Sequence, residues 1–258
     1  MNNLKIQRIT TVIHTYNSGQ TIEKALKSVL PLGGDILIID MHSTDNTLEV
    51  CRKFNCIIHS HQNVGFADPA RQFGLSKVQT KWVWVLDSDE WVDTGLCNEV
   101  LKTIEDNNNA VRIAFYIRRK NQTFGSIPKW GLHGYLFDKS LRLFTIGSIS
   151  YGSEPHNFIN VNQSVKIRQL KSYIFHLNYI STDEFFHKQK RYLALSRDVV
   201  KLSPRSNFKI LVIFVLRFFN SYFLKLGLLD GSRGLLLSIS AAYHFLALET
   251  SKKIDKDK

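Results

Sequence analysis

Two carboxylates one residue apart, in Asp87-Ser88-Asp89, directly follow an apolar run. The run from Trp82 to Leu86 is short and rich in Val and Trp, which predicts a buried strand. Parallel α/β sheets bind ligands where strands end. Two carboxylates at such an end repel each other unless a cation lies between them, and their hard oxygen atoms suit Mg²⁺ or Mn²⁺. The alternative interpretation of the triplet is a solvated turn after a strand.

Strands and helices alternate through the first half of the chain. Predicted strands cover Ile9 to His14, Asp35 to Asp40, Cys56 to His59 and the run ending at Asp87, and predicted helices cover Thr21 to Leu30, Thr44 to Phe54, Asp68 to Val78 and Asp93 to Glu105. This alternation predicts an α/β fold with a doubly wound, mostly parallel sheet. Beyond Gly125 the pattern is looser, and its predicted parts are a strand over Leu141 to Phe144, a basic helix from Thr182, and two apolar segments between Phe208 and Leu248.

The positive charge lies mostly in the second half. Of the formal +12, residues 1–130 contribute +2 (15 Lys/Arg, 13 Asp/Glu) and residues 131–258 contribute +10 (19 Lys/Arg, 9 Asp/Glu). A basic surface suits nucleic acid, anionic lipid or a phosphorylated substrate. No nucleic-acid motif accompanies the charge, so nucleic acid is not an expected partner. Three cysteines without metal or disulfide spacing predict buried thiols in a reducing compartment, and no signal peptide is predicted.

The apolar segment Phe208 to Leu229 is long enough to span a membrane, but it contains Lys209, Arg217 and Lys225. Charges are costly inside a membrane span, whereas a helix lying in the interface keeps them on its wet face. The sequence therefore predicts a cytoplasmic protein, peripheral on the inner face of the cell membrane, with an anionic membrane surface as a partner. The alternative is a buried pair of helices packing on the first domain.

Four motifs follow one another along the chain: Thr11 to Asn17, Ile38 to Thr47, Gly65 to Gly74, and Asp87 to Glu90. In this order they resemble the inverting family 2 glycosyltransferases of GT-A type, and most closely the lipopolysaccharide-core glucosyltransferase branch. The resemblance is strong over residues 8–125 and continues more weakly to residue 231. It implies a GT-A-type catalytic domain that binds a nucleotide sugar, over residues 1–180, and a basic amphipathic helical region, membrane-associating, over residues 181–258.

The resemblance also implies roles for residues that would bind the nucleotide. Thr15, Tyr16 and Asn17 are expected to line its pocket. Asp40 is expected to hold the nucleoside, because a carboxylate accepts hydrogen bonds from a base N–H or from ribose hydroxyls. Arg71 is expected to lie near the nucleotide. Two alternatives remain open, in which Asp40 caps the following loop and Arg71 is a solvated helix residue.

The D-x-D carboxylates are expected to act on the diphosphate. By the resemblance, Asp87 faces the ribose or the metal, and Asp89 ligates the Mg²⁺ or Mn²⁺ that bridges the diphosphate. This agrees with the chemistry, since transfer from a nucleotide sugar requires the leaving diphosphate to be neutralised, which a divalent cation does as a Lewis acid.

The catalytic base departs from the family pattern. An inverting transfer needs a carboxylate that removes the proton of the acceptor hydroxyl. The family often has an acidic residue directly after a histidine, but here Asn157 occupies that position and cannot take a proton. Glu154 is the nearest carboxylate and Asp138 a more distant candidate, while Glu154 as an ordinary surface carboxylate is the alternative.

These observations predict an enzyme that transfers a sugar from a nucleotide-sugar donor to a glycan acceptor with inversion. The acceptor is expected to be lipid-linked, as in lipopolysaccharide or capsule, because of the basic apolar tail. One rival is a metal-dependent nucleotidyltransferase, which ordinarily needs a Gly-rich phosphate loop that the stretch Asn17 to Gln20 does not supply. Another rival is a non-catalytic basic binding module, which the nearly neutral first half disfavours.

Overall fold

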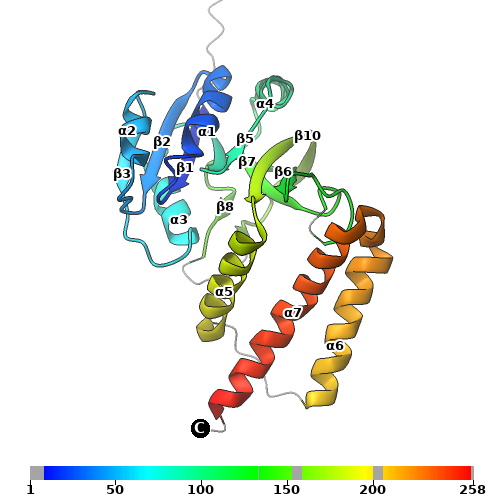
Figure 1. Cartoon of the computed structure of the whole chain (residues 1–258). Helices are drawn as coiled ribbons and strands as arrows, with labels where there is room; N and C mark the ends of the chain where they lie inside the picture. The colour runs from blue at the N-terminus through cyan, green and yellow to red at the C-terminus, as the bar shows by residue number, and fades with distance from the viewer. Residues whose placement is uncertain (1–8, 133, 153–158, 200–205, 257–258) are drawn as a thin grey trace, which may run out of the picture. The chain divides into compact units, whose positions relative to one another are not determined.

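The computed structural model describes residues 9–132, 134–152, 159–199 and 206–256 (Figure 1). The chain divides into two compact units, of which the first comprises residues 1–118 and 140–176 and the second residues 119–139 and 177–258. The second unit thus takes in a segment from the middle of the chain as well as the C-terminal region. The domain boundary predicted after residue 180 stays a prediction.

The central element is an eight-stranded sheet in the order β3-β2-β1-β4-β7-β6-β10-β5. Its strands are β1 (Ile9–Thr15), β2 (Asp35–Asp40), β3 (Ile57–Ser60), β4 (Trp82–Asp87), β5 (Glu90–Trp91), β6 (Ile113–Thr123), β7 (Lys139–Thr145) and β10 (Lys166–Tyr179). Strands β1 to β4 pair in parallel, β7 is antiparallel to β4, and β5 is antiparallel to β10. A separate small sheet joins β8 (Ile149–Ser150) and β9 (Asn160–Val161). The predicted mostly parallel sheet is confirmed.

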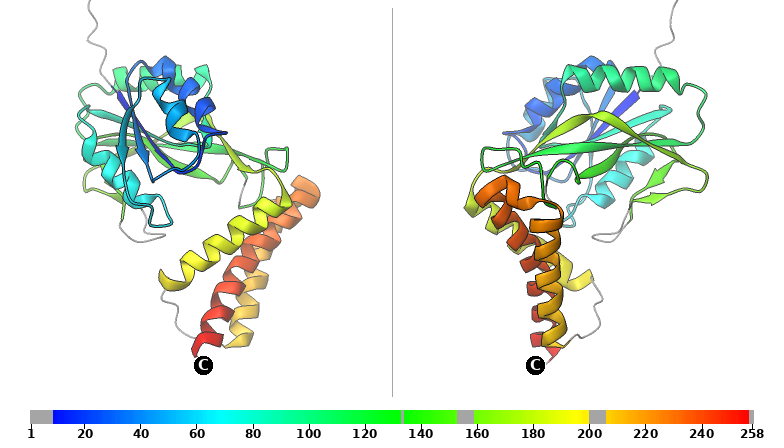
Figure 2. Two further views of the ribbon diagram at one scale, coloured as in Figure 1. Left: turned by 60° about the vertical axis from the view of Figure 1, so that its left-hand side comes forward. Right: turned by 90° about the vertical axis from the view of Figure 1, so that its right-hand side faces the viewer.

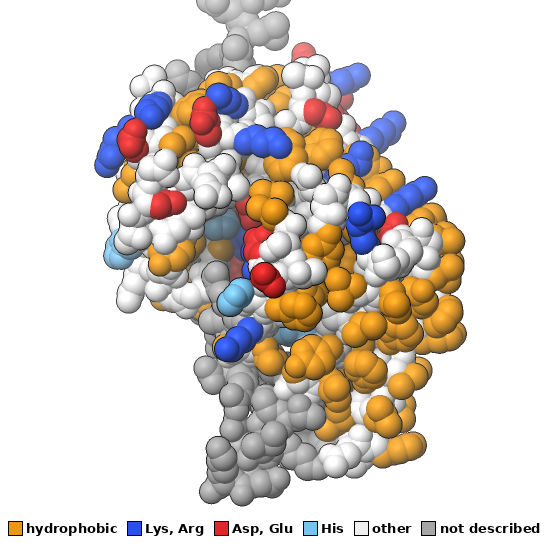
Figure 3. Space-filling model, in the orientation of Figure 1, with side chains coloured by type: hydrophobic (Ala, Val, Ile, Leu, Met, Phe, Trp, Pro, Cys, Tyr) orange, Lys and Arg blue, Asp and Glu red, His pale blue; other side chains and the backbone are white. Residues whose placement is uncertain are grey.

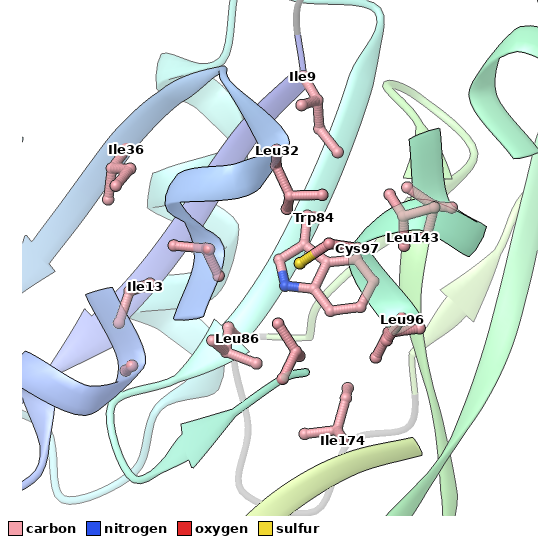
Figure 4. Close-up of a cluster of buried hydrophobic side chains, with 14 of the residues drawn as sticks. Ile9, Ile13, Leu32, Ile36, Trp84, Leu86, Leu96, Cys97, Leu143 and Ile174 are labelled. Atoms are coloured by element: carbon pink, nitrogen blue, oxygen red, sulfur yellow. The ribbon is translucent and has the colours of Figure 1, made fainter. Parts of the chain in front are cut away.

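Alternate residues of the buried strands pack against helices on the two faces of the sheet, as a pleated strand requires. On one face, Ile13, Trp84 and Leu86 belong to a core cluster that includes side chains of α1 (Ile22–Val29), α2 (Thr47–Arg52) and α4 (Thr94–Asp106). Figure 4 shows part of this cluster around Trp84. On the other face, Val12, Ile39 and Val85 join a cluster with α3 (Asp68–Lys77). Both faces of the parallel half are therefore covered.

The C-terminal part of the second unit is helical. It contains α5 (Thr182–Val199), α6 (Asn207–Phe219), a π-helical turn (Asn220–Leu224), a 3₁₀ turn (Gly227–Asp230) and α7 (Gly231–Lys256). Helices α6 and α7 run side by side in both views of Figure 2. The Asp230 carboxylate in the turn between them accepts hydrogen bonds from the backbone N–H groups of Lys129 (3.2 Å) and Trp130 (2.8 Å). The loop around Lys129 and Trp130 is therefore tied to the helical hairpin of its own unit.

Candidate active site

The ends of three neighbouring strands bring the predicted site residues together. In the parallel pairing of β1 with β2, Thr15 lies opposite Asp40, and in the pairing of β1 with β4, His14 lies opposite Asp87. Because these strands run in the same direction, their carboxyl ends meet at one edge of the sheet, where α/β folds bind ligands. The structure thus places Thr15, Asp40 and Asp87 on adjacent strands at this edge.

The loops after β1 and β2 are tied to each other by hydrogen bonds. Asn17 adopts a left-handed backbone conformation (φ +48°), its N–H donates to Ser43 Oγ at 2.9 Å, and its side-chain oxygen accepts from the N–H of Thr44 at 2.8 Å. The buried Asp40 carboxylate accepts from the N–H of Ser43 at 3.1 Å. This bond matches the alternative in which Asp40 caps its own loop, but a carboxylate has further acceptor positions for a ligand. Tyr16 stands out of the loop with 42% of its surface exposed.

Asp87 does not stand free at its strand end, because two guanidinium groups and an imidazole contact it. Arg142, on β7, donates from Nη1 to Oδ1 and from Nη2 to Oδ2, both at 3.0 Å. Arg71, on α3, donates to Oδ1 at 2.9 Å, and His14 Nε2 lies 3.3 Å from the same oxygen. Helix α3 reaches this position because it packs closely on the sheet. A Cβ atom at Gly74 would lie 2.7 Å from Val12 Cγ1.

The charges of this cluster shift the pKa values of its members. Burial by itself would raise the pKa of Asp87, but Arg142 and then Arg71 outweigh it and hold that pKa well below its usual range. Burial, followed by the charge of Arg71, lowers the pKa of His14 to about 3, so His14 is neutral at physiological pH. The pKa of Arg142 lies well above its usual value, since the attraction of Asp87 and Glu90 exceeds the effect of burial. Asp87 is therefore ionised and held by two permanent cations.

Arg142 also fixes the turn that carries the D-x-D triplet. Its Nη2 donates to Glu90 Oε1 at 2.7 Å, and Glu90 Oε2 accepts from the backbone N–H of Asp87 at 3.0 Å. Glu90 is fully buried and Arg142 is 3% exposed. We call Arg142, Asp87 and Glu90 the buried ion cluster. Neither Arg142 nor Glu90 was predicted from the sequence to have a role, although a charged residue inside the apolar run Leu141 to Phe144 indicates a buried partner.

Asp89 lies on the outer side of the same turn, beside a histidine. Its Oδ2 is 3.5 Å from His176 Nε2, and the Asp89 side chain is 36% exposed. The antiparallel pairing of β5 with β10 places His176 opposite Glu90 and so fixes the histidine next to the triplet. A carboxylate oxygen and an imidazole nitrogen at this separation suit a Mn²⁺ or Mg²⁺ ion that takes its other ligands from phosphate and water. Among the described residues no group of three or more His, Cys, Asp or Glu side chains has the arrangement of a metal site.

The structure does not test the two candidate bases, Glu154 and Asp138. Glu154 lies outside the described residues. Asp138 belongs to the second unit, where its side chain accepts hydrogen bonds from Arg119 Nη2 at 3.1 Å and from Asn121 Nδ2 at 2.6 Å. Both assignments stay predictions.

The chain is similar to known proteins in both sequence and fold. The family model described as Glycosyl transferase family 2 matches residues 10–166. An uncharacterized glycosyltransferase of Rickettsia conorii is 24% identical over 258 residues, covering 96% of this chain and 91% of the relative. The poly(ribitol-phosphate) beta-N-acetylglucosaminyltransferase TarP of Staphylococcus aureus is 27% identical over 135 residues, covering 48% of this chain and 40% of TarP.

Solved structures of S. aureus TarS share the fold. The structure of TarS with UDP superposes with a TM-score of 0.52 at 13% identity, covering 96% of this chain and 92% of the TarS chain. The structure of TarS with UDP-GlcNAc gives a TM-score of 0.51 over the same shares of both chains. This chain and TarS thus share a mixed, mostly parallel sheet with flanking helices, and the match covers 96% of this chain.

Proposed function

The chain belongs to glycosyl transferase family 2 and has a fold of GT-A type, and from this premise we propose that it transfers one sugar from a nucleotide-sugar donor to a glycan, with inversion at the anomeric carbon. The observation that carries the proposal is the edge where β1, β2 and β4 end. There Thr15, Asp40 and Asp87 lie on adjacent strands, and Asp89 lies beside His176.

The donor is proposed to be a uridine diphosphate sugar. TarS, which shares the fold, has been solved with UDP and with UDP-GlcNAc. In this chain the exposed ring of Tyr16 would contact the base, and Asp40 would accept hydrogen bonds from the base or ribose. Asn17 joins the loops after β1 and β2 by hydrogen bonds, so its proposed role is to keep the side chains of Tyr16 and Asp40 in place. Arg71 would lie near the nucleotide, because its guanidinium is hydrogen-bonded to Asp87 at the same strand end.

A divalent cation, Mg²⁺ or Mn²⁺, fits beside the D-x-D triplet, where it would act as a Lewis acid on the departing diphosphate. Asp89 and His176 would hold it, because their donor atoms face each other at 3.5 Å. The predicted metal contact of Asp87 is less favoured, since its oxygens already accept from Arg71 and Arg142. We therefore assign Asp87 to orienting the turn and contacting the ribose.

The acceptor is proposed to be a lipid-linked glycan, and the enzyme is proposed to work on the inner face of the cell membrane. The support is the charge of the second unit, which suits an anionic surface. The closer relation to enzymes of lipopolysaccharide-core synthesis rests on the order of the sequence motifs alone. A nucleotidyltransferase is the second candidate, but no phosphate-cradling loop favours it.

A thermal-shift screen tests the donor and the cation together. UDP at about 100-fold above its dissociation constant should stabilise the protein by about 2.7 kcal/mol, which raises Tm by about 5–10 °C for a chain of this size. The shift should require Mn²⁺ or Mg²⁺ and should be smaller with ADP, GDP or CMP. A nucleoside triphosphate that stabilises more than any diphosphate would instead favour the nucleotidyltransferase.

The catalytic base is tested by substituting each candidate with its amide. Glu154→Gln should lower kcat by about 100-fold or more with little change in UDP affinity, because a base acts in the transition state and not in donor binding. Asp138→Asn is the comparison, since Asp138 is already bonded to Arg119 and Asn121. If Glu154→Gln retains normal turnover while Asp138→Asn loses it, the base is Asp138.

A further inference from the structure

Helix α6 presents an apolar face to the outside of its unit. Seven side chains on α6 and the π-helical turn after it recur three or four residues apart, which places them on one side of a helix. Each has between 38% and 75% of its surface exposed; we call them the α6 stripe, and they are Phe208, Leu211, Val212, Val215, Leu216, Phe219 and Phe223. In Figure 3, hydrophobic side chains cover this part of the molecule. A contiguous exposed apolar surface marks a place where another molecule binds.

The opposite side of α6 is already used for packing on α7. Ile210 is buried, and Ser221 Oγ in the following turn is 2.9 Å from Ser238 Oγ of α7. The Arg217 guanidinium carbon lies 4.6 Å from the centre of the Phe245 ring. The stripe is therefore the face of α6 that does not pack on α7.

Charge indicates what covers the stripe. The second unit holds 18 Lys/Arg and 8 Asp/Glu, a net +10, while the first unit holds the other 16 and 14, a net +2. A second copy of the chain would bring +10 against +10, which repels. An anionic bilayer complements the charge and also accepts apolar side chains. We infer that α6 lies in the headgroup plane of an anionic membrane with its stripe toward the acyl chains, an inference that rests on the proposed work at a membrane.

The same geometry distinguishes lying in the membrane surface from crossing it. Within the described residues, one helical stretch, Asn207–Leu224, is long and apolar enough to cross a membrane by length and composition. At about 1.5 Å per residue its 18 residues cover about 27 Å, close to the hydrocarbon thickness of about 30 Å. Crossing would place Arg217 near the bilayer centre. At 100° per residue, however, Arg217 is on the side of the helix opposite Phe208, so lying flat keeps it away from lipid.

The aromatic residues of this segment differ in how far they are exposed. Phe219 and Phe223 are 47% and 43% exposed and belong to the stripe. Phe214, Phe218 and Tyr222 are only partly exposed. The apolar contact with lipid is thus assigned to the aliphatic residues Leu211 and Leu216 as much as to aromatic rings.

The test compares two triple variants of equal charge in the full-length protein. The stripe variant is Leu211→Glu, Leu216→Glu and Phe219→Glu. The control places glutamate at Leu30, Ile57 and Val111 of the first unit, whose side chains are 51%, 50% and 79% exposed. Co-sedimentation with vesicles containing phosphatidylglycerol should be weakened at least tenfold in the stripe variant and much less in the control. Wild-type binding should rise with the anionic lipid fraction, fall with salt, and be reversed by alkaline carbonate.

Three results would overturn the inference. Equal vesicle binding of both variants would show that charge alone attaches the protein. Retention after carbonate would show that the segment crosses the bilayer. A lipid-free dimer that the stripe variant converts to a monomer would make the stripe a subunit interface. Calorimetry of UDP binding with Mn²⁺ separates this inference from the proposed function, because both variants should bind UDP like the wild type. Vesicle binding without UDP binding would refute the donor assignment alone.

Discussion

Replacing Arg142 by methionine is expected to lower the free energy of unfolding by about 3–5 kcal/mol, as measured by urea denaturation. The substitution leaves the volume nearly filled but removes the donor shared by Asp87 and Glu90 in the buried ion cluster. Glu90 is fully buried, so its charge would remain in the interior without the guanidinium that now donates to it. A buried charge without its partner is among the most destabilising changes.

The pH dependence of the stability lost in Arg142→Met tests whether lost ion pairing is its cause. In the wild type the pKa of Asp87 is depressed, so its contribution to stability is present above the unfolded value of about 3.9 and is lost as the pH falls through the lower folded value. Without Arg142 the burial of Asp87 is less compensated and its folded pKa should rise. Protonation of Asp87 then removes the unpaired buried charge of the variant. The difference in free energy of unfolding between wild type and Arg142→Met should therefore decrease as the pH falls toward and below about 3.9. A deficit that stays constant with pH would mean lost packing, not lost charge pairing.

Two further variants test whether the loss of stability comes from breaking a buried ion pair or from removing any positive charge. Lys27→Met removes a cation that pairs with Glu23 on the surface of α1, where both side chains are more than half exposed, and should change the free energy of unfolding little. Arg142→Lys keeps the charge but not the planar fork that bonds Asp87 through both oxygens, and should fall between wild type and Arg142→Met.

The parallel half of the fold was predictable because its apolar runs are short and alternate with predicted helices. The strand over Asp35–Asp40 was predicted with its observed bounds, and the strand ending at Asp87 within one residue. Strand β10 was not predicted, although at 14 residues it is the longest strand in the described part of the chain. Most of its side chains are exposed or only partly buried and several are basic, so neither alternation nor an apolar run marks it. Its pairing with β5 is set by tertiary contacts.

The candidate site divides in the same way. The common position of Thr15, Asp40 and Asp87 at one edge of the sheet was predictable, because each polar residue directly ends an apolar run in the sequence. His176 was missed as a neighbour of Asp89 because 86 residues separate them and no motif spacing connects them. His14 and Arg142 were missed as partners of Asp87 because a lone charged residue within a strand does not specify its partner. These contacts depend on strand order, which places β7 beside β4 and β5 beside β10.

Asp89→Ala is expected to remove the dependence of nucleotide binding on Mn²⁺ and to lower sugar transfer by about 100-fold or more. A divalent cation on the leaving diphosphate supplies several kcal/mol of stabilisation in the transition state, and each 1.4 kcal/mol is about tenfold in rate. Stability should hold or rise slightly, because the change relieves repulsion with Asp87 and the Asp89 side chain is 36% exposed. Calorimetric titration of UDP with and without Mn²⁺ measures the first effect.

His176→Ala should reproduce this loss of cation dependence, because the two side chains are proposed to hold the same ion. In the double variant the two losses should not add, since either substitution already removes the site. Glu105→Gln on α4 removes an exposed carboxylate elsewhere in the first unit and should leave both UDP affinity and its Mn²⁺ dependence unchanged. Unchanged Mn²⁺ dependence in Asp89→Ala would contradict the assignment. Loss in Asp89→Ala but not in His176→Ala would show that the histidine positions the carboxylate without binding the ion.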